Sequence, residues 1–357
     1  MVPHLRRNRG GLSLSTLVVY VVVFSLIFIG IPTFIVSHRL WPTRRESSKF
    51  SIRLLREDLG QVVEMDLEEY LVGVVAGEMP ADFHMEALKA QAVAARTYAL
   101  YRLANQSATG SDADLSSDFR SGQAWVSPEA QRERWGWYSY FQKRWRIVSA
   151  IETTRGEVLT YGGKPIFAAY HSTSGGATQD AGAYFNDVPY LRGVLSPGEE
   201  SSPYYQTTKK VAWQAIIENL RLEIPSELAE LLDDDAVNLT EDFVLYEPKT
   251  LGELPGQEAA ELIHLARITE TYPTGRVKAM EILGVSFSGR EIREKLGLRS
   301  NWFTIQIDGA GVVFHIRGNG HGVGMSQYGA HGMALAGAAY GDILHHYYTD
   351  IEIDHWY

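Results

Sequence analysis

The chain has 357 residues and no cysteine, and its 43 acidic side chains outnumber its 33 basic ones, which gives a formal charge of −10. The absence of cysteine excludes disulfides, thiol nucleophiles and cysteine-based zinc or iron–sulfur sites. Because residues 51–357 alone carry 26 basic and 42 acidic groups, we expect no nucleic-acid partner, whereas a neutral polymer remains an acceptable substrate.

An uncharged apolar segment lies near the N-terminus, from Thr16 to Val36. Its length matches the roughly 20 residues that cross the hydrocarbon core of a bilayer as a helix. A cleaved signal peptide has a shorter apolar region that ends in small residues, and no such site follows here. We therefore predict a transmembrane anchor over 16–36, behind a short cytoplasmic tail over 1–15. Basic residues flank this segment on both sides, so the number of charges does not decide its orientation. The large size of the body after it favours an extracytoplasmic position for the body.

The remaining elements predict an α+β body in which helices and antiparallel hairpins are largely segregated. Residues 37–60 form a linker and a first strand, and the rest of the body, 61–357, holds the candidate chemistry. In chain order we expect helices over 67–104, a loop over 105–122, an aromatic helix over 132–153, a hairpin over 156–171, an acidic and mostly helical surface insertion over 199–265, a hairpin over 267–283, a short helix over 288–296, strands over 302–307 and 312–317, and a last helix over 326–348.

Glu78 occupies an unexpected position at the end of the first predicted helix. The apolar stripe that includes Leu71, Val74 and Val75 continues onto Glu78, where the pattern calls for an apolar side chain, and Pro80 then ends the helix. Burial raises the pKa of a carboxyl group, so Glu78 is a candidate general acid. A frayed helix end or a buried salt bridge would explain the same pattern.

The second predicted helix, from His84, places basic side chains on one face. Lys89 and Arg96 are seven residues apart, and Gln91 lies near the edge of that face. These side chains are candidates for binding a sugar chain beside Glu78. Ordinary exposed positions on an amphipathic helix are the alternative.

Two later segments are rich in groups that bind hydroxyls. Residues 169–178 (AYHSTSGGAT) end a strand in a turn that offers His171, Ser172 and Ser174, although such residues also close ordinary turns. Residues 317–330 (RGNGHGVGMSQYGA) are rich in glycine, which lets a backbone approach a ligand closely. The side chains that we select there for a polar ligand are His321, Ser326, Gln327 and Tyr328.

Several other chemistries are poorly supported. Neither segment contains the G-x-S-x-G of a serine hydrolase or the G-K-[ST] of a phosphate loop. His315, His321 and His331 are six and ten residues apart. These intervals do not match the H-E-x-x-H pattern of a metal site. We therefore expect neither a metal nor another cofactor.

Three ordered motifs together resemble the stage II sporulation protein D family (SpoIID/LytB). They are VAGEMP at 75–80 with EALKAQAVAARTY at 86–98, HSTSGG at 171–176, and GHGVGMSQYGA at 320–330. The resemblance covers about residues 62–350 and implies a bilobed, membrane-anchored lytic transglycosylase. Such enzymes cleave the MurNAc–GlcNAc β-1,4 bond of peptide-stripped glycan strands in peptidoglycan and leave 1,6-anhydro-MurNAc ends during engulfment of the forespore.

The resemblance also assigns roles and partners. It implies that Glu78 is the catalytic acid, that Lys89 and Arg96 are the basic residues of the second helix, and that the two later motifs bind substrate. It further implies a SpoIIP-type amidase and a SpoIIM-type membrane protein as partners. A lone acid suffices for such an enzyme, because the C6 hydroxyl of the sugar replaces water as the nucleophile. If a second carboxylate is used, Asp82 and Asp180 are the candidates.

The sequence departs from the family pattern at two places. The loop after the second helix (114–125) lacks the Cys with which some members bind a structural zinc, so we expect none. Tyr184 and Phe185 stand where relatives often have Trp, so sugar stacking there is an open question. A membrane-held glycan-binding protein that stimulates an amidase without cutting is the main alternative to the enzyme.

Overall fold

A computed structural model describes residues 14–31, 48–105, 112–118, 120, 122–223, 244–246, 265–308 and 311–357. Residues Met1–Ser47 and Ser48–Tyr357 form separate compact units. In the first unit, α1 (Leu14–Ser25) continues into the π-helical turn η1 (Leu26–Gly30). No helix within the described residues is both long and apolar enough to cross a membrane. Residues 32–36 of the predicted anchor lie outside the described residues.

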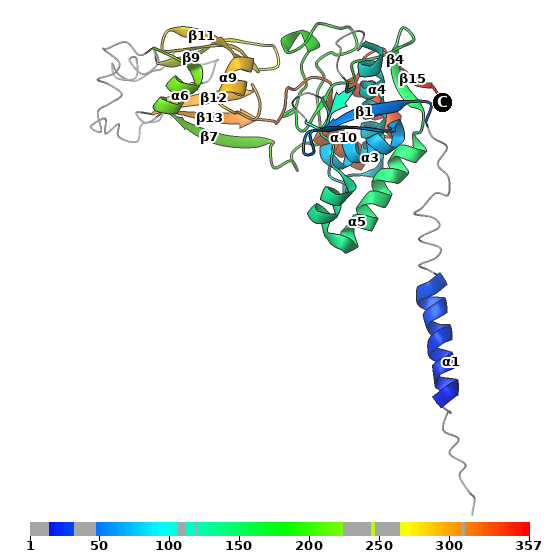
Figure 1. The fold of residues 1–357 in the computed structure, drawn as a ribbon. Coiled ribbons are helices and arrows are strands. Elements are labelled where there is room, and N and C mark those ends of the chain that lie inside the picture. Colours follow the sequence, from blue (N-terminus) through cyan, green and yellow to red (C-terminus); the bar gives the residue numbers. More distant parts are fainter. Residues whose placement is uncertain are drawn as a thin grey trace, which may run out of the picture. The chain divides into compact units, whose positions relative to one another are not determined.

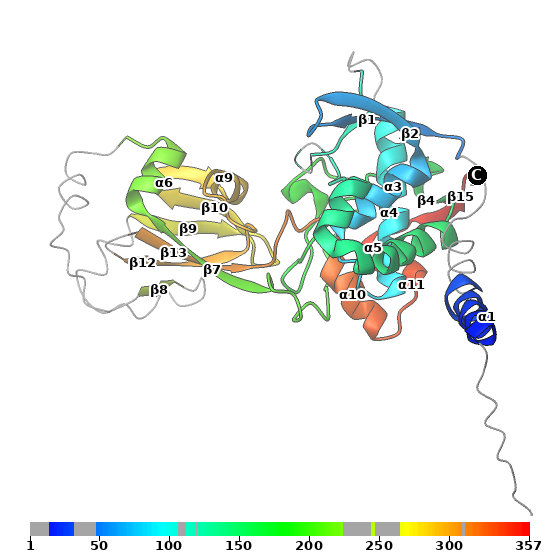
Figure 2. The ribbon, with the colours of Figure 1, turned by 60° about the horizontal axis from the view of Figure 1, so that its bottom comes forward.

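The second unit is an α+β body, as the segregation of helices and hairpins predicts, and it has two hydrophobic clusters. The first cluster defines a helical lobe, in which the alanine-rich α4 packs against the other helices (Figures 1 and 2). Small side chains permit this close packing. The helices of this lobe are α3 (Leu67–Glu78), α4 (Met85–Asn105), α5 (Pro128–Thr153), α10 (Gln327–Leu335) and α11 (Tyr340–Tyr347), with a 3-10 turn, η2 (Ala181–Ala183).

Short sheets surround these helices. The predicted first strand is present as β1, which pairs antiparallel with β2, and the C-terminal strand β15 pairs with β4. A two-residue parallel ladder between β6 and β14 joins the segments 169–178 and 317–330, which are far apart in the sequence. The strands are β1 (Ser51–Arg56), β2 (Gln61–Asp66), β3 (Leu115–Ser116), β4 (Glu157–Tyr161), β5 (Lys164–Pro165), β6 (Tyr170–His171), β14 (Met325–Ser326) and β15 (Glu352–His355).

The second cluster defines a strand lobe. One sheet has the order β7-β13-β12-β8 and the other has the order β11-β10-β9. The structure confirms the predicted hairpin over 267–283, the short helix over 288–296, which Ser288 caps, and the strands over 302–307 and 312–317. The elements are β7 (Gln206–Ala212), α6 (Trp213–Leu220), β8 (Val244–Tyr246), β9 (Ala266–Thr271), β10 (Val277–Ile282), β11 (Val285–Ser288), α9 (Gly289–Lys295), β12 (Phe303–Asp308) and β13 (Gly311–Arg317).

Three predicted elements differ from the structure in whole or in part. The last helix is two helices, because Gly337 adopts a φ of +99° just after α10 ends. The hairpin predicted over 156–171 is confirmed at its turn, where β4 pairs antiparallel with β5 and the N–H of Ile166 donates to the carbonyl of Leu159, but the return strand is shorter than predicted, since β6 pairs with β14. Residues 199–223 are not a surface insertion, because β7 is an edge strand of the four-stranded sheet and Glu199 is fully buried. Most of 224–264 lies outside the described residues.

Candidate active site

Glu78 is the last residue of α3, whose preceding turns are buried in the helical lobe. Asp66 caps the start of the helix by accepting a hydrogen bond from the backbone N–H of Glu68. At the other end Met79 is extended and buried, so the chain leaves the helix directly after Glu78. Glu78 as a whole residue is half-buried. The helical stripe therefore correctly predicted a carboxyl group at the margin of the core.

The loop over residues 122–127 lies directly against α3 and supplies a donor to Glu78. The backbone N–H of Ala124 donates to Glu78 Oε1 at 2.7 Å, and that of Val126 donates to the carbonyl of Gly73 at 3.1 Å. A Cβ atom on Gly77 would lie 2.9 Å from the carbonyl oxygen of Ala124. Gly73 and Gly77 are four residues apart on one helix face, and this spacing is the sequence signal that could have predicted the contact.

The second donor to Glu78 comes from the far end of the chain. Gln327, the first residue of α10, places Nε2 3.3 Å from Glu78 Oε2 and 3.4 Å from Gln91 Oε1. Gln91 and Gln327 are 0% and 4% exposed. The structure thus brings together Glu78, Gln91 and Gln327, three of the residues that the sequence selected. Gln91 Nε2 is buried and has no hydrogen-bond partner among the described residues.

Burial raises the pKa of Glu78 to about 7, and the two donors from Ala124 and Gln327 oppose the shift because they stabilise the carboxylate. A carboxyl group with this pKa is present in both its protonated and its ionised form near neutral pH. It can therefore donate a proton in one step and accept one in the next.

Two histidine rings lie together beside the β6–β14 ladder. Their centroids are 5.4 Å apart, and His171 Nδ1 lies 3.1 Å from the carbonyl oxygen of Val323. Burial lowers the pKa of His171 well below its usual value and that of His321 to about 3, so both rings are neutral at physiological pH. His171 Nε2 is buried without a described partner. Neutral rings suit hydrogen bonds to uncharged hydroxyl groups.

Glu199, which the sequence did not single out, holds the two later motifs together. Its carboxylate accepts the backbone N–H groups of residues 174–176 at 2.8–2.9 Å, and it also accepts the hydroxyls of Ser174, Ser196 and Ser326. Ser174 and Ser326 are fully buried in this network, so they position the turn and α10. No pattern marked Glu199, because it stands in an acidic stretch that resembles a solvated surface.

Arg276 brings the strand lobe into the same network. Its side chain is fully buried and donates to the carbonyl oxygens of Ser174, at 2.6 Å, and Ala177, at 3.3 Å. Burial lowers its pKa to about 9, and the nearby negative charge of Glu199 opposes this shift. Arg276 follows the β9–β10 turn, so the hairpin of one lobe buttresses the histidine-bearing turn of the other.

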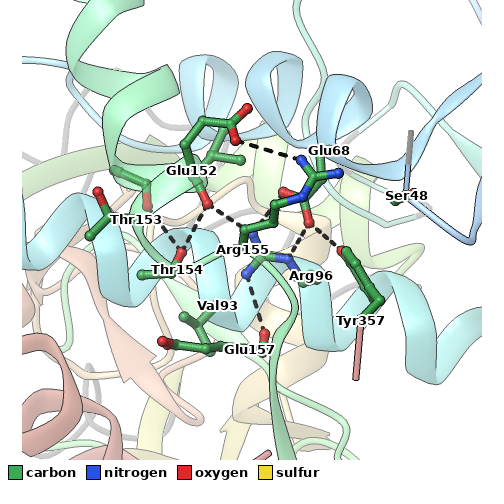
Figure 3. Close-up of polar contacts among 12 residues, drawn as sticks. Ser48, Glu68, Val93, Arg96, Glu152, Thr153, Thr154, Arg155, Glu157 and Tyr357 are labelled. Atoms are coloured by element: carbon green, nitrogen blue, oxygen red, sulfur yellow. Dashed lines mark hydrogen bonds and ion pairs between the residues drawn. The ribbon is translucent and has the colours of Figure 1, made fainter. Parts of the chain in front are cut away.

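Arg96 corrects the predicted sugar-binding face of α4. It is 0% exposed and pairs with Glu68 through Nε and Nη2, both at 2.8 Å, and the hydroxyl of Tyr357 donates to the same carboxylate (Figure 3). Arg96 therefore stabilises the core. Lys89 lies at the surface of the lobe, where it pairs with Glu86 at 2.7 Å and lies over the ring of Tyr340. A seven-residue interval fixes the face of a helix but not what packs on that face.

The remaining aromatic candidates are Tyr328, Tyr184 and Phe185. The backbone N–H of Tyr328 donates to the carbonyl of Ser172, and the ring of Tyr328 meets Phe83 edge-on at 4.9 Å. The rings of Tyr184 and Phe185 lie 5.6 and 5.1 Å from that of His321.

The candidate second carboxylates have other partners. Asp82 is exposed and pairs with Lys143, and Asp180 accepts the backbone N–H of Gly193. Within the described parts of the chain, no three His, Asp or Glu side chains are grouped so as to hold a metal ion. His315 contacts Gln306, and His331 stacks on Phe83, so these rings are not assembled with His321.

Comparison with known proteins agrees with the three motifs. The profile of the stage II sporulation protein family, SpoIID, matches residues 56–161. A stage II sporulation protein D of Bacillus amyloliquefaciens is 36% identical over 87% of this chain and 80% of its own length. The corresponding protein of Bacillus subtilis (strain 168) is 37% identical over 86% and 80%. A protein of the same strain named amidase enhancer is 30% identical over 78% of this chain and 39% of its own length. With this identity extending over most of both chains, the protein belongs to the stage II sporulation protein D family.

Proposed function

We propose that this protein is a membrane-anchored lytic transglycosylase that cleaves the MurNAc–GlcNAc β-1,4 bonds of peptide-stripped glycan strands during sporulation. The observation that carries the proposal is the single carboxyl group of Glu78, which has a pKa of about 7 and is held by donors from Ala124 and Gln327. The names of the relatives, stage II sporulation protein D and amidase enhancer, support a role in sporulation alongside an amidase.

The proposed reaction uses one group twice. Protonated Glu78 donates to the glycosidic oxygen while the C1–O bond breaks, and positive charge develops on the sugar ring. The resulting carboxylate then takes the proton of the C6 hydroxyl of the same sugar as that oxygen bonds to C1. Water is neither consumed nor required, so a second carboxylate of the kind that ordinary glycosidases use is not needed.

The surrounding polar groups suit an uncharged substrate. His171 and His321 are neutral at physiological pH, and Gln91 and His171 each keep a buried nitrogen without a described partner. We infer that these groups bind sugar hydroxyls.

The anchor and the partners complete the proposal. Residues 16–36 would hold the body at the outer face of the cell membrane, and the helical part of this segment that is described is exposed and apolar. A relative is named amidase enhancer, so we propose cooperation with a SpoIIP-type amidase and a SpoIIM-type membrane protein.

A product assay on the full chain tests the activity. Glu78→Gln removes the acid while preserving the shape of the side chain, and Glu69→Gln, at an exposed position of the same helix, is the matched control. We expect the wild type and Glu69→Gln to release ends lighter by one water than reducing ends, and Glu78→Gln to release none. Reducing ends would identify a hydrolase. If no product forms and Glu78→Gln still stimulates the amidase, the protein is a glycan-binding activator.

A further inference from the structure

Helix α5 carries a group of exposed aromatic side chains that the site does not use. Trp137 is 71% exposed and Tyr138 88%, and Phe141 and Trp145 are also exposed. The helix breaks just before them at Gly136, which has φ 70° and ψ 161°, so the chain turns a corner there (Figure 1). A side chain at that φ would be strained, and glycine removes the strain. We call residues 132–145 the α5 tip.

The α5 tip is basic on an otherwise acidic body. Residues 132–145 contain four basic side chains and one acidic one, whereas residues 51–357 have a formal charge of −16. Arg132 and Arg134 are exposed. An anionic surface therefore repels the body as a whole and attracts this region. Aromatic rings interleaved with basic side chains are the composition that binds at the headgroup level of a membrane.

We propose that the α5 tip docks on the anionic lipid headgroups of the membrane in which residues 16–36 are inserted. This inference rests on the proposed anchor. Residues 37–47 span at most about 40 Å when fully extended, so the body, which begins at Ser48, stays close to the bilayer. A body of this size has a radius of gyration of roughly 20 Å, so a tether of that length lets much of its surface reach the lipid. Among the faces within reach, the α5 tip then binds the anionic lipid, because it carries basic and aromatic side chains.

Docking there would fix the orientation of Glu78. Arg146 follows the tip and donates to the carbonyl oxygens of Ala81, at 2.8 Å, and Phe83, at 2.6 Å. These two residues lie in the segment directly after Glu78. The tip is thus tied to the catalytic segment, and a membrane contact at Trp137 would hold the site at a constant height above the bilayer.

Hydrogen exchange of the full chain in lipid nanodiscs tests the proposal. Nanodiscs of phosphatidylcholine alone are compared with nanodiscs that also contain phosphatidylglycerol. In the anionic discs we expect exchange across 132–145 to slow about tenfold, because each basic side chain near an anionic leaflet favours binding. Trp137→Ser with Tyr138→Ser should abolish the slowing and leave cleavage of soluble glycan unchanged. Leu195→Ser with Leu335→Ser, at comparably exposed apolar positions, should leave the slowing intact.

Three outcomes would overturn the proposal, and they differ in kind. Equal exchange in both kinds of disc, with the chain retained through an alkaline wash, would exclude lipid docking and leave the anchor standing. Loss of the chain in the wash would exclude the anchor and the docking that rests on it. Slowing on addition of peptide-free glycan, without dependence on lipid charge, would identify the tip as part of the glycan site. Product analysis of Glu78→Gln is independent of all three.

Discussion

Gln327 lies 249 residues after Glu78 in the sequence and places its amide nitrogen 3.3 Å from the carboxylate. The same nitrogen lies 3.4 Å from the side-chain oxygen of Gln91, so its two hydrogens have two acceptors. Gln91 therefore orients Gln327 to donate toward Glu78. A donor stabilises the ionised form, so this contact limits the rise in pKa that burial causes.

The pH dependence of cleavage should follow the single acid. Because protonated Glu78 starts the reaction and its pKa is about 7, kcat/KM on peptide-free glycan should be constant below that pH. Above it, the value should fall tenfold per pH unit. Neutral His171 and His321 should add no acidic limb, since their pKa values are depressed. A rate that is unchanged from pH 6 to about pH 9 would exclude Glu78 as the proton donor.

Gln327→Met should move this alkaline limb. Methionine has a similar length and no amide, so the carboxylate loses one donor and the pKa of Glu78 rises further. We expect the limb of kcat/KM to shift to higher pH, with a lower plateau because the loss also disorders the site. Gln214→Met, at an exposed position of α6, is the control and should shift nothing. A limb that moves to lower pH would contradict the assigned direction of the hydrogen bond.

Glu78→Gln should increase stability at neutral pH. The folded-state pKa is raised, so between about pH 4.5 and 7 the native state holds a proton that the unfolded state has lost, and stability falls as pH rises through this window. The penalty reaches about 3 kcal/mol above pH 7. Glutamine does not titrate, so the gain in Tm over the wild type should be larger at pH 8 than at pH 5. Glu200→Gln, at an exposed position, controls for the lost charge. A gain that is equal at both pH values would mean that Glu78 ionises as freely in the folded protein as in the unfolded chain.

The sequence predicted the residues of the candidate site better than it predicted the contacts between them. Glu78 interrupts an apolar stripe, so its burial could be foreseen from local periodicity. The register that places His171 beside Ser326 is a two-residue parallel ladder, too short to leave a pattern in either segment. The burial of Arg96 and of Glu199 could not be predicted, because charged residues are usually exposed and nothing in the local sequence distinguishes a buried charge from a surface one. Their positions depend on partners such as Glu68 and Arg276 that only the folded chain brings close.

Gly77→Ala should separate the loop at 122–127 from α3. The new Cβ would lie 2.9 Å from a backbone oxygen, so the loop must shift and the N–H of Ala124 must leave Glu78. We expect kcat/KM to fall at least tenfold and stability to fall by about 1–3 kcal/mol. Gly341→Ala is the matched control, because a Cβ at that helical position would meet only Ile353 Cδ1, at 4.0 Å, and alanine favours helix. Wild-type activity in Gly77→Ala would show that the Ala124 contact is dispensable.

Ser326→Ala should test whether the Glu199 network positions Gln327. Ser326 caps α10 by accepting from the N–H of Gly329 at 3.2 Å, and its hydroxyl also donates to Glu199. Ser288 caps α9 in the same way, at 3.1 Å from the N–H of Glu291, in the strand lobe. Loss of either cap should cost about 1 kcal/mol of stability, measured by urea denaturation. Only Ser326→Ala should also lower kcat at a pH where Glu78 is protonated, because α10 then loses its attachment to Glu199. If both variants lose equal stability and neither loses activity, Gln327 is positioned by Gln91 alone and the buried carboxylate serves the fold.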